Sequence, residues 1–167
     1  MDFRLVAASD APVLSRLNHD AYRGYVDWAP PGWEPPAFEE REIAERLELP
    51  GTWGQVALDG DEPVGYVILS PARTLGEVRT PIPGLAHLWH LFVARAWWGR
   101  GVAVRLHVAA MAEARRAGYS EAMLRTPRDN ARARRFYERE GWRASGAELF
   151  APDMLLDLVE YRRMLRP

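Results

Sequence analysis

A strand, a glycine turn and a helix follow one another in the middle of the chain, and together they could bind an anion. The nearly continuous apolar run Leu85–Val93 predicts a strand that is covered on both faces. Gly99 and Gly101 follow it in a turn that also contains Arg100, and helical spacing starts at Val102. Free backbone N–H groups at a helix N-terminus point outward, and the helix dipole favours negative charge. The segment therefore predicts a site for a phosphate-like group.

Two absences narrow the chemistry at this site. The chain has 167 residues, no cysteine and no lysine, so all 22 side chains of the Lys/Arg class are arginine. Without cysteine there is no thiolate nucleophile, disulfide or cysteine-bound zinc. Without lysine there is no Walker A loop and no Schiff base. A dinucleotide fingerprint is incomplete, because Val104 stands where its third small residue is required. For this segment alone, a tight turn without a ligand is the alternative interpretation.

A second motif follows from Asn130 to Trp142 and reads Asn-Ala-Arg-Ala-Arg-Arg-Phe-Tyr-Glu-Arg-Glu-Gly-Trp. Together with the apolar strand and the turn Trp98-Gly-Arg-Gly-Val-Ala103, it resembles the signature of the GNAT N-acetyltransferase superfamily. That signature pairs Gln/Arg-x-x-Gly-x-Gly/Ala with Asn-x-x-Ala-x-x-hydrophobic-Tyr-x-x-x-Gly-Phe/Trp. The likeness is specific over about residues 85–162 and topological elsewhere. It implies direct acetyl transfer from acetyl-CoA to a primary amine, without a metal.

The resemblance also implies which residues hold the cosubstrate. The strand would hold the thioester arm, the turn and the helix N-terminus the pyrophosphate, and the second motif the rest of the arm. These positions are Leu91, Phe92, Val93, Trp98, Gly99, Arg100, Gly101, Val102, Ala103, Asn130, Ala133 and Tyr137. Trp98 departs from the usual Gln or Arg, but its backbone amide is still available. Either Arg100 or Arg95 could replace the missing side-chain contact.

Tyr137 occupies the tyrosine position of the family motif. There the resemblance implies a hydroxyl that protonates the departing CoA thiolate, which is a general-acid role. The alternative is a core tyrosine that packs beside Phe136 on an amphipathic helix.

His87 is the candidate general base, because an imidazole near its reference pKa of about 6.5 accepts protons at neutral pH. Strict alternation along the strand predicts that His87 shares a face with Trp89, Leu91 and Val93, and that His90 points to the other face. A structural histidine, or a water relay from an N-terminal acid, is the alternative.

Aromatic residues near the N-terminus are candidates for the acceptor site, since the resemblance places this segment over it. The candidates are Tyr22, Tyr25, Trp28 and Trp33, with Trp89 from the strand. Residues 1–94 carry 7 arginines and 14 acids, a net charge of −7, whereas residues 95–143 carry 12 arginines and 5 acids, a net charge of +7. Aromatic faces beside acids such as Asp27 and Glu34 would suit a cationic amine. Ordinary loop packing is the alternative.

Other functions fit the sequence less well. A catalytically degenerate acyl-CoA-binding module is the first alternative, and Trp98 is its supporting feature. The second is a nucleic-acid surface, but it lacks a recognised motif, interleaved aromatic residues and a basic composition, and CoA phosphates already account for some of the arginines. That surface would consist of Arg125, Arg128, Arg132, Arg134, Arg135 and Arg139. The acceptor is open between a polyamine, an aminoglycoside, an amino acid and a peptide amine.

The elements that must position these residues alternate along the chain. Strands are predicted over 3–7, 52–58, 63–69, 85–93, 122–125 and 155–161, and helices over 10–25, 39–49, 102–116 and 130–140, with a loop over 71–84. This order predicts a mixed α/β sheet with helices on both faces. The resemblance implies a mostly antiparallel sheet of six or seven strands with about four helices. We expect one domain over residues 1–167 and a cytoplasmic location without a membrane segment. Dimers are common in the family, so the resemblance is compatible with a homodimer.

Overall fold

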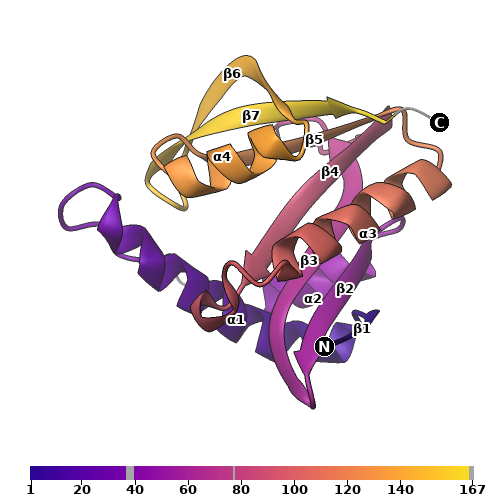
Figure 1. Cartoon of the computed structure of the whole chain (residues 1–167). Helices are drawn as coiled ribbons and strands as arrows, with labels where there is room; N and C mark the ends of the chain where they lie inside the picture. Colours follow the sequence, from indigo (N-terminus) through magenta and orange to yellow (C-terminus); the bar gives the residue numbers. More distant parts are fainter. Residues whose placement is uncertain (37–39, 77, 166–167) are drawn as a thin grey trace.

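The computed structural model describes residues 1–36, 40–76 and 78–165, and within them it is a mixed α/β fold (Figure 1). Its elements are β1 (Asp2–Leu5), α1 (Ala11–Arg23), α2 (Glu40–Glu48), β2 (Trp53–Asp59), β3 (Glu62–Arg73), β4 (Pro81–Val93), α3 (Val102–Arg116), β5 (Glu121–Pro127), α4 (Ala131–Arg139), β6 (Arg143–Ala151) and β7 (Leu156–Met164). Short 3₁₀ turns are η1 (Ala8–Asp10), η2 (Gly24–Asp27) and η3 (Arg95–Trp97). The predicted helix start at Glu39 lies outside the described residues. No described helix is long and apolar enough to cross a membrane.

All seven described strands form one sheet in the order β1-β2-β3-β4-β5-β7-β6. Every neighbouring pair is antiparallel except β4 and β5, which run parallel because α3 crosses over between them. The predicted fold class, a mostly antiparallel mixed sheet with helices on both faces, is confirmed.

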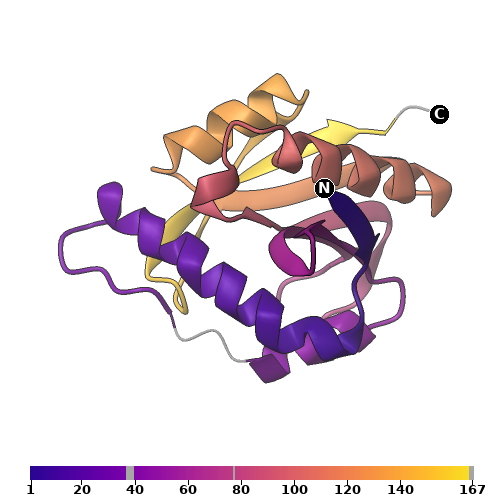
Figure 2. The same ribbon diagram turned by 60° about the horizontal axis from the view of Figure 1, so that its bottom comes forward.

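Helices cover both faces of the sheet (Figure 2). On one face α1 and α2 pack through Leu14 and Ile43 against Val56 and Ile68. On the other face α3 buries Leu106 and its apolar neighbours against β2 to β5, and Tyr137 of α4 packs at the edge of the same cluster. Full burial of such an aliphatic side chain is worth about 1.5–3 kcal/mol. The helices therefore fix the two faces from which the central strands can be reached.

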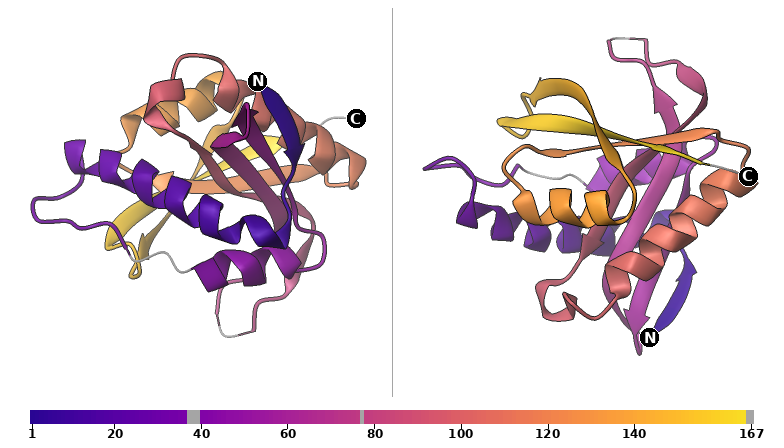
Figure 3. Two further views of the ribbon diagram at one scale, coloured as in Figure 1. Left: turned by 90° about the horizontal axis from the view of Figure 1, so that it is seen from below. Right: turned by 45° about the horizontal axis from the view of Figure 1, so that its top comes forward.

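The parallel pair β4–β5 separates along its length. Its ladder consists of Leu85↔Glu121, Ala86↔Ala122 and His87↔Met123, although β4 continues to Val93 and β5 to Pro127. Figures 1 and 3 show β5, β7 and β6, with α4 against them, diverging from β4 beyond this point. Beyond His87, the edge of β4 that faces β5 pairs with no described strand.

A bulge in β4 changes which side chains share a face. Ile68 of β3 lies opposite His90 but the next residue, Leu69, lies opposite Leu88, so Trp89 is an extra residue. The predicted faces are therefore wrong. Leu91 and Val93 join Leu88 on the α3 face, whereas His87, His90 and Phe92 lie on the α1–α2 face.

The predicted loop over 71–84 is also wrong at both ends, because β3 reaches Arg73 and β4 starts at Pro81. Proline is tolerated here because these strand ends have one open edge. The ladder between β2 and β3 ends at Leu69, before Pro71, and β5 joins β4 only from Leu85, after Pro81 and Pro83.

Strand β6 was not among the strand ranges predicted from the sequence. Its residues are almost all exposed, because β6 lies at the edge of the sheet and, of the described strands, pairs with β7 alone. A strand that buries neither face has no alternating pattern to detect, and Gly146 (φ +84°) interrupts it further.

Candidate active site

A cleft of about 1090 Å³ opens where β4 and β5 separate. Its walls are the free part of β4, the end of β5, the start of α3, and side chains from α1, η2, α2 and α4. All of the residues predicted for the site line this cleft except Arg100 and Trp33. The fold thus brings together segments that are far apart in the sequence.

At one end of the cleft lies the glycine turn that precedes α3. Gly99 (φ +75°) and Gly101 (φ +80°) both have left-handed backbone conformations, and a Cβ at either position would meet no atom within 4 Å. The turn therefore favours glycine at these positions because of its left-handed backbone conformation, and not because a side chain would clash with a neighbour. The N-cap residue of α3 is Gly101, which has no side chain to cap the helix, so the first N–H groups of α3 are available to bind an anion.

Trp98 braces this turn with its side chain. The indole Nε1 donates a hydrogen bond to the carbonyl oxygen of Val93 at 2.7 Å. The guanidinium of Arg132, from α4, lies 3.5 Å from the centre of the Trp98 ring, closer than that of Arg95 at 5.6 Å. Neither of the two arginines considered from the sequence is thus the nearest cation, since Arg100 stacks on Trp97 instead. The only sequence signal for Arg132 is its place two residues after Asn130.

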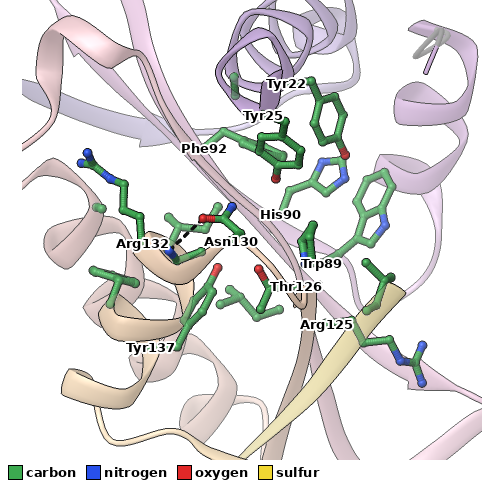
Figure 4. A pocket seen from close by; sticks show the side chains of 18 of the residues that line it. Tyr22, Tyr25, Trp89, His90, Phe92, Arg125, Thr126, Asn130, Arg132 and Tyr137 are labelled. Atoms are coloured by element: carbon green, nitrogen blue, oxygen red, sulfur yellow. Dashed lines mark hydrogen bonds between the residues drawn. The ribbon is translucent and has the colours of Figure 1, made fainter. Parts of the chain in front are cut away.

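Helix α4 presents Asn130 and Tyr137 to the middle of the cleft (Figure 4). The Asn130 side chain accepts a hydrogen bond from the N–H of Ala133 at 3.0 Å, which caps the helix. Its amide faces the Tyr25 hydroxyl on the opposite wall. Burial raises the pKa of Tyr137, so its hydroxyl keeps its proton at neutral pH. Tyr137 therefore remains able to donate a hydrogen bond into the cleft.

The two strand histidines are neutral at physiological pH. Burial, followed by the charges of Arg125 and Arg46, lowers the pKa of His87 to about 3. Burial also lowers the pKa of His90, which forms a 3.0 Å hydrogen bond through Nδ1 with the hydroxyl of Tyr66. The assumption that His87 titrates near 6.5 is therefore wrong, and His87 is a much weaker base than a free imidazole.

Aromatic side chains form the wall that faces Tyr137. Tyr22, Tyr25 and Trp28 line the cleft, and Tyr22 packs edge-on against Phe92 at 5.6 Å. Trp33 lies behind them, where it stacks on Tyr25 and donates a hydrogen bond to the carbonyl of Met154. Trp33 therefore supports this wall without lining the cleft.

The acids expected near the acceptor do not surround it. Asp27 lines the cleft but lies 3.8 Å from Arg95, and Glu34 does not line it. Among the described residues, no three histidine or acidic side chains gather closely enough to hold a metal ion.

The sequence also matches a known protein family. The family model described as the acetyltransferase (GNAT) family matches residues 18–142. No curated protein matches the chain in sequence.

Solved structures share the fold at low identity. The PaiA N-acetyltransferase from Thermoplasma acidophilum, solved with coenzyme A, has a TM-score of 0.76 and 13% identity over 98% of this chain and 99% of that one. The YncA putative acetyltransferase from Salmonella typhimurium, solved with acetyl-CoA, has a TM-score of 0.72 and 19% identity over 100% of this chain and 95% of that one. A putative GNAT acetyltransferase from Desulfovibrio desulfuricans has a TM-score of 0.71 and 25% identity over 99% of both chains.

Proposed function

Because this chain belongs to the acetyltransferase (GNAT) family, we propose that it transfers the acetyl group of acetyl-CoA directly to a primary amine. The observation that carries the proposal is one continuous cleft. It runs from an uncapped helix N-terminus, along the unpaired edge of β4, to a wall of aromatic side chains. An anionic head, an extended arm and an amine could occupy these three parts in that order.

The α3 N-terminus and the unpaired edge of β4 offer groups that would bind acetyl-CoA. The free N–H groups of α3 and the guanidinium of Arg132 would bind the pyrophosphate, since both offer positive charge to an anion. The arm would lie along Leu91–Val93, where a thioester carbonyl could accept a backbone hydrogen bond. A donor of this kind is worth about 10²–10³ in rate at an oxyanion.

Tyr137 and His87 would act on opposite sides of the reacting carbon. The neutral amine attacks the thioester carbon, the C–S bond breaks, and the Tyr137 hydroxyl gives its proton to the departing sulfur. His87, with a pKa of about 3, would accept a hydrogen bond from the amine N–H and so orient its lone pair. The amine proton then leaves to water, because a base this weak cannot hold it, and the Tyr137 phenolate takes a proton back from water. Because the chain contains no cysteine, no acetyl thioester can form on the enzyme.

The experiment is an assay of thiol release from acetyl-CoA across a panel of amines, with mass spectrometry of the products. We expect equal amounts of free CoA and N-acetylated amine. Calorimetric binding of CoA without acetyl transfer to any amine would instead indicate an acyl-CoA-binding module.

A further inference from the structure

Four arginines gather at the end of the cleft that lies beyond Trp89. They come from different parts of the fold: Arg46 from α2, Arg73 from the end of β3, Arg79 from the β3–β4 connection and Arg125 from β5. All four line the same cleft as His87. Figure 4 shows Trp89 and Arg125 on the opposite side of the cleft from Arg132. Convergence of four cations from four segments is a property of the folded cleft and not of any one stretch of sequence.

Contacts hold these side chains at the cleft. The Arg46 guanidinium lies 4.3 Å from the centre of the Trp89 ring, and Arg73 donates a 2.9 Å hydrogen bond to the carbonyl of Arg79. Burial lowers the pKa of Arg46, Arg79 lowers it further, Glu42 opposes the shift and Arg73 adds to it. The arginines are thus close enough to repel one another.

The carboxylates of the cleft do not neutralise this charge. Among the described residues, no carboxylate forms an ion pair with Arg46, Arg73 or Arg79, and Glu42 is the one acid that supports Arg46.

Arg125 has a partial partner. It pairs with Glu160 at 3.3 Å, but its Nε is buried without a hydrogen-bond partner. Asp153 also lines the cleft, where its charge raises the pKa of Tyr22. An excess of positive charge from Arg46, Arg73 and Arg79 therefore faces this end.

These arginines are separate from the place proposed for the CoA phosphates. His87 and Val93 are six residues apart on β4, which corresponds to about 20 Å along a strand. The glycine turn and Arg132 lie beyond Val93. Arg46 and Arg125 lie at the other end of this stretch, because their charges lower the pKa of His87. One anion at the turn cannot reach both groups, so these arginines offer a site for a second anion.

We propose that the acceptor is a small primary amine that carries a carboxylate, as an amino acid does, and that Arg46, Arg73, Arg79 and Arg125 bind this carboxylate. The inference rests on the proposed function and names its substrate class. Arginine suits the task because its planar fork binds carboxylate through two parallel hydrogen bonds. The same positive charges disfavour a protonated amine nearby, so the bound amine would lose its proton more easily. A polyamine or another purely cationic acceptor would be repelled.

The test compares free amino acids with their carboxamides and with the amines that lack the carboxyl group. Calorimetry measures binding of each compound to the enzyme saturated with CoA, and thiol release measures kcat/KM. We expect each amino acid to bind about 10-fold or more tightly than its amide, and its kcat/KM to be larger by a similar factor.

Variants connect the preference to the arginines. Arg79→Gln, at an exposed position, and Arg46→Gln should each reduce the acid-to-amide ratio about 10-fold. Arg41→Gln is the matched control, because Arg41 lies on α2 with its side chain 79% exposed and does not line the cleft.

Equal or tighter binding of the amides would overturn the inference, and so would an acid preference that both variants keep. Failure of the proposed function looks different: no amine would be acetylated, while the binding comparison would still decide whether this end of the cleft prefers a carboxylate.

Discussion

Tyr137 is the residue whose chemistry is most specific to the proposed reaction. Its hydroxyl remains protonated because burial raises its pKa, and it points into the middle of the cleft (Figure 4). Tyr137→Phe removes the proton donor but keeps the ring that packs against Trp142. We expect kcat to fall about 10²-fold, as loss of a general acid does, with the Kd for CoA within a factor of about two.

The matched control is Tyr119→Phe, because Tyr119 is partly buried against the same core cluster but does not line the cleft. If both variants lost activity equally, or if only CoA binding fell in Tyr137→Phe, the general-acid role would be contradicted.

The low pKa of His87 predicts how the reaction rate depends on pH. Since its pKa is about 3, His87 remains neutral across the range in which an amine titrates. The rise of kcat/KM with pH should therefore report deprotonation of the free amine. In His87→Gln the rate should fall, because the orienting acceptor changes, but the midpoint of the rise should stay in place. A midpoint near pH 6.5 in the wild type that vanishes in the variant would restore His87 as the general base.

At the scale of elements, the turn before α3 should separate backbone strain from ligand binding. Gly101→Ala places a Cβ on a left-handed residue (φ +80°) and should cost about 1 kcal/mol of stability, although the space beside it is open. It should also weaken acetyl-CoA binding, since Gly101 is the N-cap of α3 and adjoins the N–H groups proposed to bind the pyrophosphate.

Gly118→Ala is the matched control for this variant. Gly118 has φ +84° and equally open surroundings, but it follows the far end of α3. It should lose similar stability in thermal unfolding and keep its affinity for acetyl-CoA. An equal loss of affinity in both variants would contradict the assignment of the pyrophosphate to this turn.

Helix α3 also carries His107, which should make the fold sensitive to acid. Its Nε2 accepts hydrogen bonds from Trp142 at 2.9 Å and Arg163 at 3.2 Å, so the ring proton lies on Nδ1. Burial, then the charges of Arg163 and Arg115, lowers the pKa of His107 to about 4. The unfolded chain therefore binds an extra proton between about pH 6.5 and 4, and stability falls as pH decreases through that window.

The expected slope is on the order of 1 kcal/mol per pH unit for this histidine. In urea unfolding, His107→Gln should have a shallower dependence on pH than the wild type, because glutamine accepts the same hydrogen bonds without titrating. His19→Gln, at an exposed position on α1, is the control. An unchanged slope in His107→Gln would contradict the assignment.

The sequence predicted the elements whose pattern arises locally. The helix that starts after Asn130 and the strand ending at Val93 are confirmed, because a capping side chain and an apolar run identify them. What it could not predict depends on pairing partners. The bulge at Trp89 exists only in the register between β3 and β4, and it reversed the predicted faces. The low pKa of His87 likewise depends on arginines from other segments.

At the scale of the molecule, segment charge was a poor guide to where charge acts. The N-terminal part has a net charge of −7, yet Arg46, Arg73 and Arg79 from that part face the cleft. In the basic middle part, Arg128 pairs with Glu148 and Asp157, and Arg134 donates a hydrogen bond to Tyr161. Those arginines are therefore held by the fold. That residues 1–167 form a single domain, and that the chain dimerises, both stay predictions.

Calorimetric titration of the wild-type chain with acetyl-CoA is the decisive experiment, because every proposed step needs that molecule in the cleft. We expect saturable binding at one site per chain, with an affinity that Gly101→Ala lowers and Gly118→Ala preserves. Absence of any binding to the wild type, in protein that unfolds cooperatively, would rule out acetyl transfer from acetyl-CoA in this cleft.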